Sequence, residues 1–525
     1  MVANANVTAL SGASDALPRY SQSLEEYVIA GGDERMHLSK QGVNKYFAQP
    51  KPVSGLILRS SCTGTNPSEH SFAAAQAVLT NLQNGTISFD AQMDLVRSRL
   101  IQYLGLQSLP GLDVIINPSG TDCEYAPLLA ALAVLGRPLS QSDVENPPIV
   151  NILTAGGEVG SMSATAASGA HFQLFAPNGD AVTVGAPLDG IPKGAIQVHE
   201  VVYRNSQGEV VDKAAEALAL ARQHLELGKI VVLHSVPSSK MGLVVSDHPD
   251  ILALQQEFGT RLIRVIDACQ LRCQPVVIKR YLAEGALVMV TGSKYFEAPS
   301  FCGAVFVPEQ VASVIRDKLG NTVAVPSGFG QYLTRSDIGS SFTALRNALP
   351  ERENVGLCVR WEFALSWLAE LATLGQETVE RTIRAWVSGV RLLMQEFSES
   401  IELFSGESYD DDTLMANCNT IVAFKVRANG AFLTTDPLKN LYALLWQDLS
   451  SLATTDAERL ILSQQCQIGQ PVKICNEFAV LRFALGASTT VRMAKTGVER
   501  ELEGDRRILD KLAWLVAHFD QLPKA

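Results

Sequence analysis

The sequence predicts an α/β protein: a three-layer α/β/α large domain around a mostly parallel sheet, followed by a smaller α+β domain. Between residues 113 and about 308, β-rich runs alternate with helical patterns, which is typical of parallel sheets. The final third combines long helical patterns with separate strand-like runs. At 525 residues, 47% of them hydrophobic and 18% charged, the chain can bury a core in each of two domains.

Composition argues against several classes of function. The chain has 43 Lys and Arg residues against 54 Asp and Glu, a formal net charge of −11, and no basic stretch, so we expect no nucleic-acid partner. No apolar run approaches the roughly 18 residues of a membrane span, and the first residues are too polar for a secretory signal. We therefore expect no membrane association and a cytoplasmic location. The nine cysteines lack metal-ligand spacing, so we expect reduced thiols and no metal.

Three segments are expected along the chain. Residues 1–55 lack sustained periodicity and are predicted to form an N-terminal arm. Residues 56–345 are predicted to form the large domain, and residues 346–525 the small one. Early in the large domain, the polar run 60–68 follows an apolar stretch and is either a lid over a site or a surface turn.

The first candidate binding element is a strand, a tight turn and a helix. Residues 113–117 are strand-like, and an apolar helical pattern covers residues 125–135. Because the first turn of a helix has unpaired N–H groups, Gly120 and Thr121 could bind a phosphate there. The alternative is a capping box in which Thr121 and Glu124 only cap their own helix.

The second candidate is an acid and a lysine that each follow an apolar strand. Residues 261–266 and 286–291 are predicted strands and residues 275–283 a helix, so Asp267 and Lys294 lie at strand carboxyl ends. Ligands bind at that edge of an open α/β sheet. A carboxylate and an amine suit the two ends of pyridoxal 5'-phosphate, since the ring nitrogen must stay protonated and the aldehyde needs a lysine. The hydroxyls of Thr291 and Ser293 could add phosphate ligands.

The order of these motifs resembles that of fold type I pyridoxal phosphate enzymes, the aspartate aminotransferase superfamily, and within it the class V branch with the cysteine desulfurases. The matching motifs are Gly120-Thr121, Asp267-Ala268-Cys269-Gln270 and Thr291-Gly292-Ser293-Lys294. The resemblance implies that Asp267 pairs with the pyridinium nitrogen and that Gln270 donates to the phenolic oxygen. It further implies that Thr291 and Ser293 hold phosphate, and that Lys294 forms the Schiff base.

The same resemblance bears on oligomeric state. Gly330 lies in Gly328-Phe329-Gly330-Gln331, which is similar to the glycine-rich segment that reaches the phosphate of the neighbouring subunit in such dimers. It implies a homodimer with shared active sites. The alternative is an ordinary turn after Pro326-Ser327.

Two departures from the family pattern stand out. The family stacks an aromatic residue or histidine on the cofactor ring, and residues 156–161 and 170–172 both lie in the corresponding interval. His171 is our first choice for the residue that stacks on the ring. The alternative is that His171 is a core histidine that only bonds to the backbone. The run 233–242 resembles the strand end that lines the pocket in this branch. The histidine that precedes the lysine in desulfurases is Ser293 here, which puts desulfurase chemistry in question.

The final third offers a candidate for substrate binding. Residues 361–374 and 505–519 are predicted helices, and residues 420–426 a strand. Arg482 interrupts the apolar run 478–486, where an unpaired charge is costly. By the resemblance, Arg482 would bind the substrate α-carboxylate, with Arg492 and Arg360 as second choices. The alternative is an outward-facing side chain at a strand edge.

The sequence thus predicts a pyridoxal phosphate-dependent lyase or transferase that acts on an amino acid through an external aldimine. Side-chain elimination or replacement, with carbon–sulfur or carbon–carbon chemistry in specialised biosynthesis, is preferred because of the Asp-Ala-x-Gln signature. One alternative is an aminotransferase, and another is an inactive binding protein that retains the fold. The sequence does not name the substrate or the bond that is broken.

Overall fold

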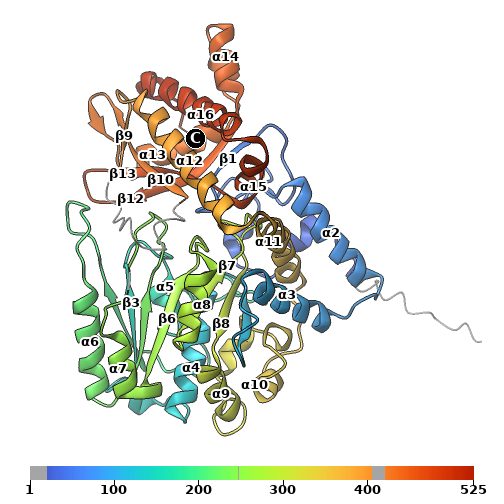
Figure 1. Ribbon diagram of the computed structural model, residues 1–525, viewed down its shortest axis with the longest axis vertical. Helices are drawn as coiled ribbons and strands as arrows, with labels where there is room; N and C mark the ends of the chain where they lie inside the picture. The colour runs from blue at the N-terminus through green and yellow to red at the C-terminus, as the bar shows by residue number, and fades with distance from the viewer. Residues whose placement is uncertain (1–19, 246, 405–419, 525) are drawn as a thin grey trace, which may run out of the picture.

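A computed structural model of the chain describes residues 20–245, 247–404 and 420–524 (Figure 1). The first 19 residues of the expected N-terminal arm lie outside the described residues. The part of the arm that is described contains the short helix α1 (Leu24–Val28). None of the helices in the described ranges combines the length and the apolar character that crossing a bilayer requires.

The larger sheet has seven strands in the order β2-β8-β7-β6-β5-β3-β4. Its strands are β2 (Asp113–Asn117), β3 (Ile149–Thr154), β4 (Ile196–Val201), β5 (Ile230–Ser235), β6 (Leu262–Ala268), β7 (Leu287–Thr291) and β8 (Gly303–Val307). Only the two pairings of β8 are antiparallel. Because β2 and β7 are both antiparallel to β8, β2 runs in the same direction as the parallel strands. The predicted mostly parallel sheet is confirmed, and six carboxyl ends lie at one edge.

Helices cover both faces of this sheet. Ile263 and Val265 face the layer that includes α4, whereas Leu262 and Ile266 on the same strand face the opposite layer, as a two-residue strand period requires. The first layer contains α4 (Tyr125–Leu135), α5 (Ser163–Ala167), α9 (Glu309–Lys318) and α10 (Thr343–Ala348). The second contains α2 (Glu69–Gln83), α3 (Phe89–Tyr103), α6 (Ala214–Glu226), α7 (Ile251–Phe258), α8 (Pro275–Ala283) and α11 (Val355–Leu374). The three-layer α/β/α architecture is confirmed.

The smaller sheet has six strands and forms the core of the second domain. Its order is β1-β12-β13-β10-β11, with β9 also paired to β10, and only the β1–β12 pairing is parallel. The strands are β1 (Ile57–Arg59), β9 (Ile401–Leu403), β10 (Ile421–Ala428), β11 (Ala431–Phe432), β12 (Cys466–Lys473) and β13 (Ala479–Ala484). The helices are α12 (Gln376–Gln395), α13 (Thr435–Trp446), α14 (Asp456–Ser463), α15 (Ala487–Thr496) and α16 (Glu499–Ala517).

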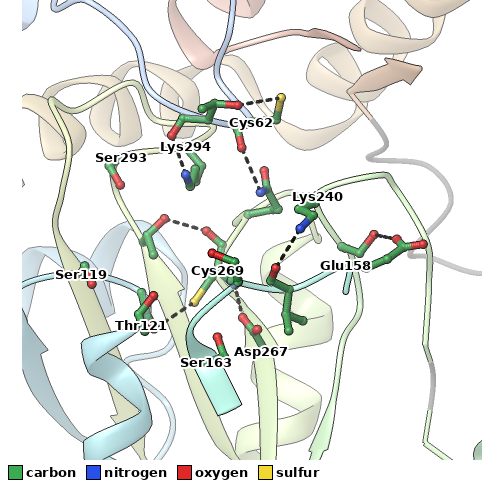
Figure 2. A pocket seen from close by; sticks show the side chains of 18 of the residues that line it. Cys62, Ser119, Thr121, Glu158, Ser163, Lys240, Asp267, Cys269, Ser293 and Lys294 are labelled. Carbon is green, nitrogen blue, oxygen red and sulfur yellow. Dashed lines mark hydrogen bonds between the residues drawn. The ribbon is translucent and has the colours of Figure 1, made fainter. Parts of the chain in front are cut away.

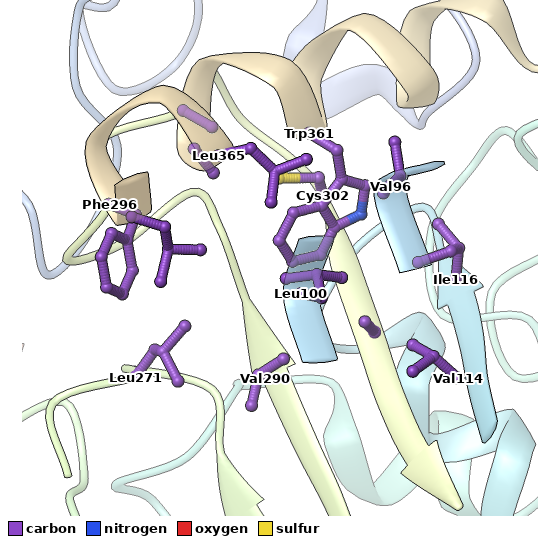
Figure 3. Close-up of a cluster of buried hydrophobic side chains, with 14 of the residues drawn as sticks. Val96, Leu100, Val114, Ile116, Leu271, Val290, Phe296, Cys302, Trp361 and Leu365 are labelled. Atoms are coloured by element: carbon purple, nitrogen blue, oxygen red, sulfur yellow. The ribbon is translucent and has the colours of Figure 1, made fainter. Parts of the chain in front are cut away.

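Packing differs from the expected domain bounds at both ends of the large domain. Strand β1 lies just after residue 56 but pairs with β12 of the small domain. Helix α11 lies after residue 346, yet Trp361 and Leu365 pack with Val114 and Val290 of the large sheet (Figure 3). Local patterns identify a strand and a helix at these places, but the partner of each is a tertiary property.

Candidate active site

A cavity of about 200 Å³ lies where the carboxyl ends of the large sheet face the small domain (Figure 2). The large domain contributes the turn after β2, the ends of β6 and β7, and the segments that follow β3 and β5. The small domain contributes Gln470 and Arg482, and the loop after β1 contributes Cys62 and Thr63. The predicted polar loop 60–68 therefore does reach a site.

Asp267 is the residue before the last in β6, and its side chain lies at the cavity wall. Its carboxylate accepts a hydrogen bond from the Cys269 amide at 3.0 Å. Burial raises the pKa of Asp267, because a charged carboxylate loses hydration there. A bound cation would reverse that shift, so the site favours a positively charged group next to Asp267.

Glu124, considered above only as part of a capping box, and His234, from the run expected to line the pocket, form a buried pair. His234 Nε2 lies 3.6 Å from Glu124 Oε2, and both side chains are inaccessible to solvent. Burial lowers the pKa of His234 to about 3 and raises that of Glu124 well above its usual value. His234 is therefore neutral near pH 7 and does not supply the charge that Asp267 would pair with.

Lys294 follows β7 and directs its amine into the same cavity. Its Nζ donates to the Thr63 carbonyl at 2.5 Å and lies 5.5 Å from the centre of the Phe301 ring. Burial, with the nearby charges of Arg35 and Arg482, lowers the pKa of Lys294 to about 8. A lowered pKa leaves more of the amine unprotonated near neutral pH, which is the form that attacks a carbonyl.

Hydroxyl groups gather where a phosphate ligand was predicted. Thr121 lines the cavity and makes no capping bond, so the capping-box alternative is not observed. The Ser293 hydroxyl is fully buried, lines the cavity, and has no hydrogen-bond partner among the described residues. A buried hydroxyl without a partner is costly, so a ligand acceptor would stabilise it. Thr291 differs, because its hydroxyl already donates to the Cys269 carbonyl at 2.6 Å.

Gly120 is required by the close packing of its turn. A Cβ atom at this position would lie 2.8 Å from Thr291 Cγ2 and 3.1 Å from Cys269 Sγ. The absence of a side chain lets the turn after β2 approach the ends of β6 and β7. The three motifs that are separate in the sequence meet through this contact.

Gln270 is held in place from both ends of its amide. Its Nε2 donates to the Cys62 carbonyl at 3.3 Å, and its Oε1 accepts from Arg272 Nε at 3.1 Å. Gln270 lines the cavity beside Asp267. The amide therefore has a fixed orientation toward the site, as a residue that contacts a ligand requires.

Arg482 lies on β13 and is 1% exposed, so the outward-facing alternative is not observed. Its guanidinium lines the cavity and donates to the carbonyls of Lys240 at 2.7 Å and Gln470 at 2.8 Å. Of the second choices, Arg360 donates to the backbone carbonyls of Phe301 and Val28, and Arg492 forms an ion pair with Glu501 at 2.7 Å. Neither lines the cavity.

Two predicted site residues lie elsewhere. His171 bonds through Nδ1 to the Tyr332 hydroxyl at 2.7 Å and does not line the cavity, and its expected ring-stacking role stays a prediction. The other interval that we considered, represented by Val159, Gly160 and Ser161, does line it. Gly330 belongs to a short helical turn and packs near Pro350, outside the cavity. Its expected role involves a second subunit and stays a prediction.

Three charged residues in the cavity wall were not predicted individually. Arg35 comes from the N-terminal arm, forms an ion pair with Asp33 at 2.6 Å, and lies 4.4 Å above the Phe301 ring. Lys240 and Glu158 come from the segments after β5 and β3. Lys240 belongs to the run expected to line the pocket, but no pattern distinguished it from a surface lysine. Among the described residues, no cluster of three or more His, Cys, Asp or Glu could hold a metal ion.

Neither a model of a known protein family nor a curated protein matches this sequence. Similar solved structures include the tryptophan decarboxylase of Catharanthus roseus in complex with L-tryptophan. It is 13% identical, with a TM-score of 0.50 over 89% of this chain and 83% of that one. Another is an alanine–glyoxylate aminotransferase from Nostoc sp., also 13% identical, with a TM-score of 0.50 over 88% of this chain and 97% of that one. The chain therefore has the fold type I architecture that the sequence predicted, and at this identity the likeness shows the fold alone.

Proposed function

We propose that this chain is a pyridoxal 5'-phosphate-dependent enzyme that acts on an amino acid. The observation that carries the proposal is the placement of Asp267, Lys294 and the hydroxyl-bearing turn around Thr121 on the walls of one cavity. The unpartnered Ser293 hydroxyl and the close approach that Gly120 permits fit a phosphate-bearing ligand. The two similar enzymes are named for amino acids, which supports the class of substrate.

Pyridoxal phosphate, when bound, supplies an aldehyde for covalent attachment and a ring that withdraws electrons from the substrate α-carbon. Asp267 would keep the ring nitrogen protonated, and Lys294 Nζ would hold the aldehyde. Once substrate displaces it, Lys294 would carry the proton that leaves or returns to the substrate. Thr121 and Ser293 would bind the phosphate, Gln270 the phenolic oxygen, and Arg482 the substrate carboxylate through its planar fork.

For the reaction, we propose side-chain elimination or replacement, with an aminotransferase as the alternative. The Asp-Ala-x-Gln motif at residues 267–270 supports the first. A desulfurase reaction needs a thiolate, and burial raises the pKa of Cys269, a cavity-lining thiol, well above its usual value. The chemistry that we propose therefore depends on Lys294 rather than on Cys269.

The cofactor proposal is tested by reconstituting the protein with pyridoxal phosphate and recording the absorbance of the lysine-bound cofactor. We expect a visible-edge band in the wild type and its loss in Lys294→Ala. After borohydride reduction, mass spectrometry should locate the cofactor on Lys294. Lys318→Ala, an exposed lysine at the end of α9, is the matched control and should keep the band. A wild type that stays colourless and unmodified contradicts the proposal.

A product analysis separates the two reactions. Incubation with a panel of amino acids should release a keto acid together with the lost side chain, while the cofactor returns to its starting spectrum. Accumulation of pyridoxamine phosphate without side-chain release would favour the aminotransferase instead.

A further inference from the structure

Positive charge in the cavity wall exceeds what its carboxylates neutralise. Four cationic side chains line the cavity: Arg35, Lys240, Lys294 and Arg482. Arg35 forms an ion pair with Asp33 at 2.6 Å. Within the described part of the chain, the other three make hydrogen bonds only to neutral oxygen atoms, and no carboxylate lies within 4.0 Å of their nitrogens.

The proposed function accounts for two of these three cations. Lys294 would be taken up by the cofactor aldehyde, and Arg482 would be neutralised by the α-carboxylate of the substrate. Among the described residues, Lys240 forms no ion pair, and its Nζ donates to the Val159 carbonyl at 3.2 Å.

Glu158 is the nearest candidate for a counter-ion, but it is already engaged. Its carboxylate forms a short ion pair with Arg204 and accepts a hydrogen bond from the Ser239 hydroxyl. No ion pair links it to Lys240. Glu158 lines the cavity and raises the pKa of Lys240 through its charge, but its carboxylate is bonded to Arg204 and Ser239 and not to the Lys240 amine.

Lys240 and Arg482 are neighbours, because the Arg482 guanidinium donates to the Lys240 carbonyl at 2.7 Å. Loss of hydration on burial and, second, repulsion from Arg482 lower the pKa of Lys240 to about 8, against the opposing effect of Glu158. An anion bound between them would remove both penalties. A cavity with this wall therefore selects a ligand with more negative charge than one carboxylate.

The position of Lys240 separates it from the proposed phosphate site. In Figure 2, Lys240 and Thr121 lie on opposite sides of Asp267 and Cys269, and Lys240 is beside Glu158. Lys240 thus lies on the Glu158 side of the cavity, and Thr121 lies on the other side of Asp267. We take the Glu158 side as the place where substrate would extend.

We propose that Lys240 binds a second anionic group of the substrate, so that the enzyme acts on amino acids with a carboxylate or similar anion in the side chain. This inference rests on the proposed function, because Arg482 and Lys294 must take the α-carboxylate and the cofactor. Lys240 is then a specificity-determining residue.

The test compares two four-carbon acids that differ in charge. Succinate, with two carboxylates, and butyrate, with one, are titrated into the reconstituted enzyme, and binding is followed by absorbance and by calorimetry. We expect the wild type to bind succinate at least tenfold more tightly than butyrate. Lys240→Gln, which can still donate to the Val159 carbonyl, should lose this preference and bind butyrate within about twofold of wild type. Lys240→Arg should restore it, and Lys318→Gln is the matched control.

Two results would overturn the inference: equal binding of both acids by the wild type, or a preserved preference for succinate in Lys240→Gln. If that variant kept the preference and also bound pyridoxal phosphate more weakly, Lys240 would be assigned to the cofactor phosphate. Failure of the proposed function is recognised separately, because the absorbance before titration shows whether the wild type holds the cofactor. In that case, calorimetry on the cofactor-free protein still decides whether Lys240 selects the dianion.

Discussion

At the scale of single residues, burial sets the protonation of the amine at Lys294. The folded protein surrounds this side chain with low-dielectric groups and with the cations Arg35 and Arg482, which lowers its pKa to about 8 from its ordinary value of 10.5. The unfolded chain keeps the proton up to about pH 10.5. Folding at neutral pH therefore costs free energy at the residue that is proposed to bind the cofactor, a cost common at functional sites.

This cost predicts a pH dependence of stability. Between pH 8 and 10.5 the unfolded state binds more protons at Lys294 than the folded state, so the stability of the wild type rises with pH. The difference between the pKa of about 8 in the folded protein and 10.5 in the unfolded chain corresponds to about 3 kcal/mol of unfolding free energy. In the cofactor-free protein, the stability of Lys294→Met relative to wild type should fall by up to that amount across the interval. Urea unfolding of both proteins at several pH values measures this difference in stability. The contributions of the lysines that both proteins share cancel in the comparison.

A relative stability that does not change with pH would show that the amine is hydrated and not buried. Exposed Lys318→Met provides the matched control, because its free energy of unfolding relative to wild type should stay constant across the same pH interval.

At the scale of elements, the turn between β2 and α4 depends on Gly120. Replacing Gly120 with Ala forces its Cβ within 2.8 Å of Thr291 Cγ2, so the turn must move away from the end of β7. Overpacking of this kind costs about 1–3 kcal/mol. We expect Gly120→Ala to weaken pyridoxal phosphate binding roughly tenfold or more, measured by equilibrium titration of the absorbance band, because Thr121 would move with the turn.

Gly504→Ala is the matched control for this substitution. Gly504 lies inside helix α16, and its Cβ would meet only Ile57 Cγ2 at an ordinary 3.6 Å. Since alanine is a better helix former than glycine, the control should gain about 0.5–1 kcal/mol of stability and leave cofactor binding unchanged. Equal cofactor affinity in Gly120→Ala and wild type would show that the turn does not position the phosphate ligand.

At the scale of the whole molecule, strand β1 joins the N-terminal segment to the C-terminal helix. Arg59 at the end of β1 is 1% exposed and forms ion pairs with Asp505 at 2.6 Å and Glu501 at 3.0 Å, both on α16. The loop that follows carries Cys62 and Thr63 into the cavity. The fit of the small domain to the site therefore depends on a contact between residues more than 400 positions apart.

Loss of this contact should destabilise the protein strongly. Arg59→Ala leaves Asp505 buried without its main counter-ion, which costs about 3–5 kcal/mol. Arg459→Ala, which removes an exposed ion pair with Asp456 on α14, should cost at most about 1 kcal/mol. Chemical unfolding of both variants measures the difference. Similar losses in the two would contradict the role given to Arg59.

The homodimer predicted from the segment around Gly330 stays a prediction at this scale. Gly330 packs near Pro350 of its own chain and lies outside the cavity.

The sequence by itself determined the sheet, the order of its motifs and the main polar residues of the site. Asp267, Lys294 and Thr121 each follow a strand of local apolar pattern, and parallel strands bring their carboxyl ends to one edge. For that reason Gln270, Ser293 and Thr291 could also be placed without a structure. Arg482 was found because a charge inside an apolar strand needs a partner.

Only the tertiary structure decided which residues complete the cavity. His171 is hydrogen-bonded to Tyr332, which lies 161 positions away in the sequence, and no local pattern encodes this contact. Arg35 and Thr63 enter from segments without periodicity, and Lys240 differs from a surface lysine only through its neighbours. Strand ends are set by short-range patterns, whereas the packing of loops and the pairing of charges depend on the whole fold. We infer the class of substrate from the charge of Lys240. That charge has no ion-pair partner among the described residues, and this too depends on the whole fold.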